Sequence, residues 1–173
     1  MSNRGLETDW RHSTGCARAS KEEIEVLLGA LVTDSEAVRD AGLRGLKSLV
    51  SAFPSGGEEA RIVARRTWVA RFDPVEENRL LAKELWDAAG FDASSDDGMC
   101  DDIIDDVLHP VDCVRQAAAE GLAKLLEGRP ASKTVGILDV LLATYEEKLE
   151  MIPPVIDHLG RTGTYVCSSD QSL

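Results

Sequence analysis

The sequence has few aromatic residues and no long apolar run. Only three Trp, two Tyr and three Phe occur among 173 residues, while Leu and Ala are abundant, and this composition favours helices over a β-sandwich. No apolar run approaches the ~20 residues that a membrane-spanning helix requires. Residues 1–20 mix Arg4, Glu7, Asp9 and Arg11 without an apolar core. We therefore expect neither a membrane span nor a secretory signal peptide.

Cysteines and catalytic motifs are also scarce. The four cysteines are scattered without a C-x-x-C pair, so we expect reduced thiols and no metal or cofactor. The sequence contains no G-x-S-x-G elbow, Walker loop, H-E-x-x-H or G-x-G-x-x-G motif. His12, His109 and His158 have no partner nearby in the sequence, and Cys113 suits a packed small residue. We expect no enzymatic activity and no small-molecule substrate.

Acidic residues outnumber basic ones: the sequence has 31 Asp and Glu but 19 Lys and Arg, which gives a net charge of −12. An acidic balance of this size argues against nucleic-acid binding by the whole domain, although it permits a local basic patch. The acidity is concentrated in residues 73–113, which hold 13 acidic and 2 basic residues. Residues 1–72 hold 10 acidic and 11 basic residues and are nearly neutral.

A repeat organises the chain around three arginines. Arg39, Arg79 and Arg115 are separated by 40 and 36 residues. The positions one before each arginine and three, seven and ten after it lie on one side of a helix. They hold Val38, Gly42, Leu46 and Leu49; Asn78, Ala82, Trp86 and Ala89; and Val114, Ala118, Leu122 and Leu125. The small residue three after the arginine permits a close approach of two helices.

Each repeated helix follows another stretch of helical apolar periodicity. These stretches contain Ile24, Leu27, Leu28 and Leu31; residues 62–72; and Ile103, Ile104, Val107 and Leu108. A fourth stretch contains Val135, Leu138, Leu142, Tyr145 and Leu149. Gly90 and Gly128 are placed to end helices, and Pro74 and Pro110 to begin them.

The repeat length identifies the type of hairpin. Units of 36–40 residues with an arginine in the second helix favour HEAT repeats over tetratricopeptide repeats. The sequence therefore predicts an all-α fold, an α-solenoid of HEAT-type helical hairpins. We expect a flank over residues 1–19 that is a partial repeat or disordered. Residues 20–161 are expected to form about three full repeats and a partial fourth, and residues 162–173 an atypical, disordered tail.

Four aspartates in one expected helix resemble a magnesium site. Asp101, Asp102, Asp105 and Asp106 form the D-D-x-x-D pattern with which prenyl-diphosphate enzymes hold magnesium. Such enzymes need a second box and a larger cavity, which the sequence does not predict. The alternative is an amphipathic helix whose aspartates form a solvated face opposite its apolar residues. We prefer that alternative, and a magnesium-dependent enzyme is retained only as a less favoured function.

The repeated arginines are expected to be structural. In HEAT arrays such an arginine pairs with an acid of the same or the adjacent repeat. Asp73 lies six residues before Arg79, and the equivalent positions in the other repeats are Thr33 and His109. We expect Arg39, Arg79, Arg115 and Asp73 to hold the repeats together.

Three segments carry a more specific resemblance. They are residues 68–86; residues 103–107 followed by 114–117; and residues 145–149 followed by 153–161. Over about residues 22–161 the chain resembles the HEAT-repeat translational activators called general control non-derepressible protein one. The resemblance implies a long, non-enzymatic, cytoplasmic scaffold that associates with ribosomes. It further implies activation of the kinase that phosphorylates translation initiation factor 2 alpha in amino-acid starvation.

One basic cluster is a candidate ribosome contact. It consists of Arg61, Arg65, Arg66 and Arg71, interleaved with Trp68 and Phe72. Arg61 and Arg65 are one helical turn apart and are spaced to clamp a phosphate of ribosomal RNA. The alternative, which we favour, is that these arginines pair with Glu58, Glu59 and the acidic third repeat.

The resemblance also sets the expected partners. They are the ribosome, protein partners of the translational stress response and neighbouring HEAT repeats. Members of the family are many times longer, so we expect a fragment, a truncated isoform or a partial gene model. The family's kinase-binding portion lies elsewhere along the array, and no kinase contact is assigned to these residues. A HEAT scaffold of another system, such as a transport receptor or a phosphatase scaffold, is the alternative function.

Overall fold

The computed structural model describes residues 21–93, 98–150, 155–156 and 162–163. The predictions for residues 1–19 and 164–173 lie outside this described part. The chain divides after Leu125 into two compact units, which we describe separately. Within the described residues, no helix combines the length and apolar character needed to cross a membrane.

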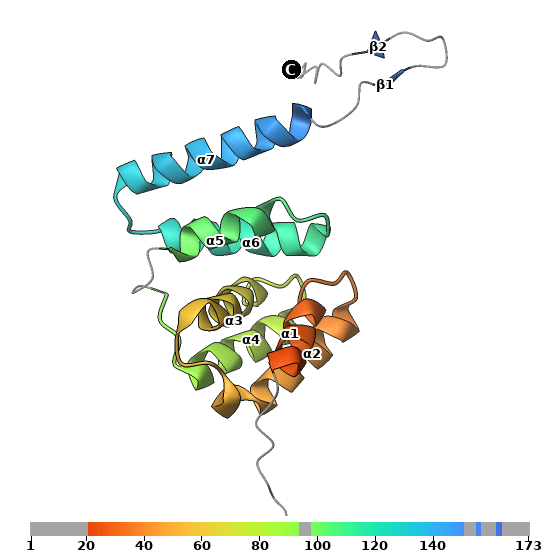
Figure 1. Ribbon diagram of the computed structural model, residues 1–173, viewed down its shortest axis with the longest axis vertical. Coiled ribbons are helices and arrows are strands. Elements are labelled where there is room, and N and C mark those ends of the chain that lie inside the picture. The colour runs from red at the N-terminus through yellow and green to blue at the C-terminus, as the bar shows by residue number, and fades with distance from the viewer. Residues whose placement is uncertain (1–20, 94–97, 151–154, 157–161, 164–173) are drawn as a thin grey trace, which may run out of the picture. The chain divides into compact units, whose positions relative to one another are not determined.

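The first unit consists of helical hairpins, as Figure 1 shows. Its helices are α1 (Lys21–Ala30), α2 (Glu36–Ser48), α3 (Gly57–Ala70), α4 (Glu76–Ala89), α5 (Met99–Val107) and α6 (Asp112–Leu126). A short 3-10 helix, η1 (Val50–Ala52), follows α2. Within hairpins α1 packs on α2 and α3 on α4, and between hairpins α2 packs on α4 and α3 on α5. The predicted all-α fold of HEAT-type hairpins is confirmed.

The second unit begins with the longest described helix, α7 (Ala131–Glu150). It corresponds to the predicted first helix of a partial fourth repeat. Two short strands follow, β1 (Val155–Ile156) and β2 (Thr162–Gly163), and they pair antiparallel with Val155 opposite Gly163 and Ile156 opposite Thr162. The predicted boundary between residues 161 and 162 falls between the two strands, and the domain limits stay predictions.

The core of the first unit follows the predicted repeat positions. The residues three and seven after each arginine are buried in all three repeats: Gly42 and Leu46, Ala82 and Trp86, and Ala118 and Leu122. At the position before the arginine, Asn78 and Val114 are buried, whereas Val38 is exposed.

Helix α3 is buried on several sides, as its irregular apolar pattern predicts. Val63, Thr67, Trp68 and Val69 are all buried. The Trp68 ring packs edge-on against Trp86 of α4 with a centroid separation of 5.1 Å. The indole Nε1 of Trp68 also donates to the backbone oxygen of Gly121 at 3.0 Å. This indole therefore ties α3 to both α4 and α6.

Two helices begin later than predicted. Helix α4 begins at Glu76 rather than Pro74, and α6 begins at Asp112 rather than Pro110. In each case a side chain before the proline bonds to the backbone nitrogen two residues on. The backbone nitrogen of Val75 donates to Asp73 Oδ1 at 2.9 Å, and the backbone nitrogen of Val111 donates to His109 Nδ1 at 3.2 Å. These local turns keep the prolines outside the helices. Gly90 and Gly128 adopt the predicted positive φ after α4 and α6.

Each repeated arginine binds the loop that enters its own helix. The Nη1 atom of Arg39 donates to the backbone oxygens of Thr33 and Asp34 at 3.0 and 2.9 Å. Arg79 and Arg115 make the same two bonds to the oxygens six and five residues earlier, at 2.8–3.1 Å. Because the acceptors are backbone oxygens, the contact does not require a particular side chain at those positions.

Arg39 makes a second contact that joins two repeats. Its Nε and Nη2 atoms donate to the carboxylate oxygens of Asp73 at 2.6 and 3.2 Å. The side chains of Arg39 and Asp73 are only 4% and 6% exposed. The hydrogen bond to Asp73 raises the pKa of the Arg39 guanidinium above its ordinary value. The acid at this position thus pairs with the arginine of the preceding repeat, while Arg79 uses the Asp73 backbone oxygen.

We expect Arg39→Met to lower the free energy of unfolding by about 3 kcal/mol, because it leaves the buried Asp73 carboxylate without its counter-charge. Urea denaturation followed by circular dichroism measures the loss. Arg44→Met is the matched control, since Arg44 lies on the same helix and pairs with Asp40 at an exposed site. Equal denaturation midpoints for the two variants would contradict a special role for Arg39.

Gly42 allows α1 and α2 to approach closely. A Cβ atom at this position would lie 2.9 Å from the Ala30 Cβ and 3.1 Å from the Leu27 backbone oxygen. We therefore expect Gly42→Ala to destabilise the chain by about 1–3 kcal/mol, despite the better helix propensity of alanine. Gly29→Ala in α1, where no atom lies within 4 Å, is expected to leave stability unchanged or raise it. Thermal unfolding of both variants tests this difference in sign.

Candidate functional site

Three arginines of the predicted basic cluster, Arg61, Arg65 and Arg66, lie on α3 and face α5. Arg61 Nη2 donates to both carboxylate oxygens of Asp102 at 2.6 Å. Arg65 Nη1 donates to the backbone oxygen of Asp102 at 2.8 Å. Arg66 Nη1 donates to Asp106 Oδ1 at 2.7 Å. We call these five residues the α3–α5 ion-pair cluster. We had favoured the alternative that these arginines pair with acids rather than with RNA, and in these contacts the third repeat supplies the acids.

Burial in this cluster increases along α3. Arg61 is 45% exposed, whereas Arg65 and Arg66 are 19% exposed and Asp106 is 3% exposed. Burial lowers the pKa of the Arg66 guanidinium below its ordinary value, and the Asp106 charge opposes that shift. Arginine remains protonated because its ordinary pKa is so high. The inner part of the cluster is therefore a set of buried, opposite charges.

The innermost charged pair, Arg65 and Asp106, does not form a hydrogen bond. Arg65 Nε lies 3.6 Å from Asp106 Oδ2, which is beyond a good hydrogen bond. Both atoms are buried and have no hydrogen-bond partner within the described residues. Each retains the electrostatic attraction of the other.

Arg71 lies apart from the other three arginines. Its guanidinium carbon is 4.5 Å from the centroid of the Trp68 ring and 5.3 Å from that of Trp86. This geometry is a cation–π contact. Burial against the rings lowers the pKa of Arg71, while Asp87 opposes the shift. Arg71 thus covers the aromatic packing between α3 and α4.

The aspartate box is divided between two environments. Asp101 and Asp105 are exposed, but Asp102 is half-buried and Asp106 is buried. The prediction that all four aspartates form one solvated face was therefore wrong, because arginines from α3 draw two of them into the interface. Arg61 and Arg65, like Asp102 and Asp106, are four residues apart and so share one face of their helix, and these matching faces of opposite charge were a signal for the pairing. Within the described residues, no three His, Cys, Asp or Glu side chains are grouped as metal ligands would be.

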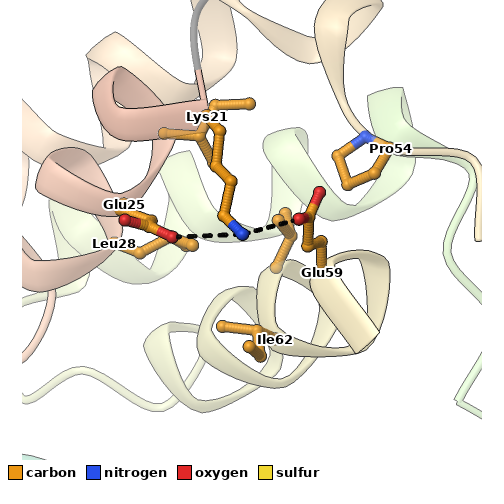
Figure 2. A pocket seen from close by; sticks show the side chains of 8 residues that line it. Lys21, Glu25, Leu28, Pro54, Glu59 and Ile62 are labelled. Atoms are coloured by element: carbon orange, nitrogen blue, oxygen red, sulfur yellow. Dashed lines mark ion pairs between the residues drawn. The ribbon is translucent and has the colours of Figure 1, made fainter. Parts of the chain in front are cut away.

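A small cavity lies between α1 and α3, and Figure 2 shows its lining. Its volume is about 50 Å³, and apolar side chains such as Ile24, Leu28 and Ile62 form its walls. Lys21 Nζ lies 2.8 Å from Glu59 Oε1 and 3.8 Å from Glu25 Oε1 beside it. Ligand pockets usually reach several hundred Å³ (roughly 300–1,000). This cavity is a gap in helix packing and does not fit a metabolite.

Comparison with known proteins gives a family and close relatives. The family model described as "Stalled ribosome sensor GCN1, HEAT repeats" matches residues 55–172. The chain is 41% identical over 150 residues to the stalled ribosome sensor GCN1 of Mus musculus, and 40% identical over 150 residues to that of Homo sapiens. Each alignment covers 85% of this chain and 6% of the relative. No solved structure matches the chain.

The inner acid of the cluster provides a stability test. We expect Asp106→Ala to lower the free energy of unfolding by about 3 kcal/mol, because it leaves the half-buried guanidinium of Arg66 without a counter-charge. Asp105→Ala, one residue away and exposed, is expected to change stability by less than about 0.5 kcal/mol. Urea denaturation of both variants measures the difference. Similar losses in the two would show that α5 does not depend on the α3–α5 ion-pair cluster.

Proposed function

Because the chain belongs to the family of HEAT repeats of the stalled ribosome sensor GCN1, we propose that it is a non-catalytic scaffold segment of a ribosome-associated translational activator. In that role it acts in the cytoplasm and promotes activation of the kinase that phosphorylates translation initiation factor 2 alpha in amino-acid starvation. Its partners are the ribosome, proteins of the translational stress response and neighbouring HEAT repeats. The family match over residues 55–172 carries this proposal.

The packing of the first unit supports a scaffold role. Its most buried charges, Arg39 with Asp73 and Arg66 with Asp106, bond to one another across helix interfaces. Charged groups arranged for catalysis instead converge on a cavity that admits substrate. These buried ion pairs therefore hold neighbouring hairpins in register with one another.

We place the ribosome contact of this segment at Arg61, Arg65, Arg66 and Arg71. Arg65 and Arg66 are held by α5, so Arg61 is the most accessible member of the α3–α5 ion-pair cluster. Its Nη2 atom donates to both oxygens of the Asp102 carboxylate, and a guanidinium group that binds a carboxylate can also bind a phosphate. Binding to RNA would exchange the Asp102 carboxylate for a phosphate group at the same guanidinium.

This exchange predicts opposite effects from the two partners of one ion pair. Arg61→Gln removes the phosphate ligand and is expected to reduce co-sedimentation of the chain with purified ribosomes. Asp102→Asn removes one of the two carboxylates that bond to Arg61, the other being that of Glu58, and is expected to increase it. Both effects should weaken as the salt concentration rises, because phosphate contacts are screened. Quantification of the chain in ribosome pellets measures them.

The two variants also control for each other. Both break the same Arg61–Asp102 ion pair, so an effect of lost stability would have the same sign in both. Circular dichroism establishes that each variant is folded. Equal pelleting of wild type and both folded variants would exclude the contact at Arg61, and failure of the wild-type chain to pellet would contradict ribosome association of this segment.

A further inference from the structure

The turn between α5 and α6 has the same hydrogen bonds as the turn before α4, but a different side chain makes them. In both turns the side chain before a proline accepts the backbone N–H two residues on, that of Asp73 before α4 and that of His109 before α6. The backbone oxygens of these two residues accept from Arg79 and Arg115, the arginines of their repeats. His109 therefore takes the structural place of Asp73.

The two acceptors respond differently to pH. A carboxylate accepts hydrogen bonds at every pH above about 4, the ordinary pKa of aspartate. An imidazole nitrogen accepts only while it carries no proton, and a protonated histidine has a proton on each nitrogen. Because His109 Nδ1 accepts from Val111 at 3.2 Å, the single proton of the uncharged imidazole lies on Nε2. Protonation of His109 therefore removes the acceptor of this turn.

The charges that act on His109 come from three helices. Arg66 lies on α3, Asp106 on α5 and Arg115 on α6. Burial lowers the pKa of the His109 imidazole below its ordinary value. The charges of Arg66 and Arg115 lower this pKa further, while that of Asp106 opposes them. The folded surroundings therefore favour the uncharged imidazole.

A positive charge on His109 disturbs contacts on both sides of the turn. Arg115 Nη1 donates to the backbone oxygens of His109 and Pro110 at 2.8 and 2.9 Å, so two positive groups would then lie at one turn. Asp106, the acid that a positive imidazole would attract, already accepts from Arg66 at 2.7 Å. Protonation thus sets His109 in competition with an arginine that ties α3 to α5.

We propose that His109 is an acid-sensitive switch in the turn between α5 and α6. When the imidazole is protonated, the turn loses its bond to Val111 and α5 is loosened from α3. The preceding turn, in which Asp73 is the acceptor, stays closed. This switch is independent of the proposed ribosome contact, since it requires neither Arg61 nor RNA.

The pH range of the switch follows from the direction of the pKa shift. His109 has a lower pKa in the folded chain than in the unfolded chain, where the ordinary value is about 6.5. The contribution of His109 to stability is therefore complete above about pH 6.5 and is lost as the pH falls through the lower pKa of the folded chain. Carboxyl groups of ordinary pKa begin to be protonated below about pH 5. A comparison of about pH 7.5 with about pH 5.5 therefore reports on histidine.

Two substitutions at this position test the proposal. His109→Asn keeps an acceptor for the Val111 N–H, because an Asn side chain makes the same turn and does not titrate. His109→Ala removes the acceptor at every pH. Urea denaturation of the full chain, followed by circular dichroism, gives the midpoint at each pH. His12 and His158 are present in all three chains, so their titration cancels in the comparison.

We expect the wild-type midpoint to fall between the two pH values by at least about 0.3 M urea more than that of His109→Asn. At the higher pH the wild type should resemble His109→Asn. At the lower pH its midpoint should approach or fall below that of His109→Ala.

Measurements on the wild-type chain keep the test decisive if a variant fails to fold. NMR of the imidazole gives the pKa and the tautomer of His109, and hydrogen exchange gives the protection of the Val111 amide. We expect a proton on Nε2, a pKa below about 6.5 and protection that falls as His109 is protonated. The Val75 amide, which Asp73 holds, is the matched control and should keep its protection.

Three results would overturn the proposal. One is an equal loss of midpoint in the wild-type and His109→Asn chains. Another is a His109 pKa at or above its ordinary value, and the third is a Val111 amide whose protection does not change as His109 titrates.

Discussion

A guanidinium group bonded to two backbone oxygens closes each hairpin of the first unit. Arg39, Arg79 and Arg115 hold the turn between the two helices of their own repeat. Backbone oxygens that lack a partner within a helix need another donor, and the guanidinium supplies it to two oxygens in each turn. The arginine thus satisfies the turn and orients the second helix at once. Stacking of one hairpin on the next depends on that orientation, and at Arg39 the same side chain extends across the interface to Asp73.

Ion pairs between α3 and α5 likewise hold the third repeat against the second. The excess of acid in residues 73–113 does not produce a uniformly repulsive surface, because Asp102 and Asp106 meet arginines of α3. Two features that suggest separate chemistries in the sequence, a phosphate-binding arginine cluster and a magnesium-binding aspartate box, are two sides of one helix interface. Arg61 lies at the exposed end of this interface, and the ribosome contact that we propose depends on it.

Several features could be predicted because they depend on local pattern. The helical hairpins follow from apolar periodicity, the helix ends at Gly90 and Gly128 from the need for positive φ, and the close approach at Gly42 from a small residue at a repeated position. The starts of α4 and α6 were misplaced by two residues, since a proline signals a helix start but cannot reveal that Asp73 and His109 first bond to the intervening loop. The burial of Asp106 was missed because its partners lie 40 residues away in the chain.

The sequence by itself determined the all-α architecture and the family, since periodicity, repeat spacing and identity with relatives are properties of the chain alone. The tertiary structure decided which charged side chains are exposed to solvent and which are held in ion pairs. A helical wheel places all four aspartates of α5 on a polar side, yet only the packing of α3 against α5 separates the exposed Asp101 and Asp105 from the engaged Asp102 and Asp106. Periodicity reports which face of a helix is apolar, and only the placement of neighbouring helices establishes whether that face is covered.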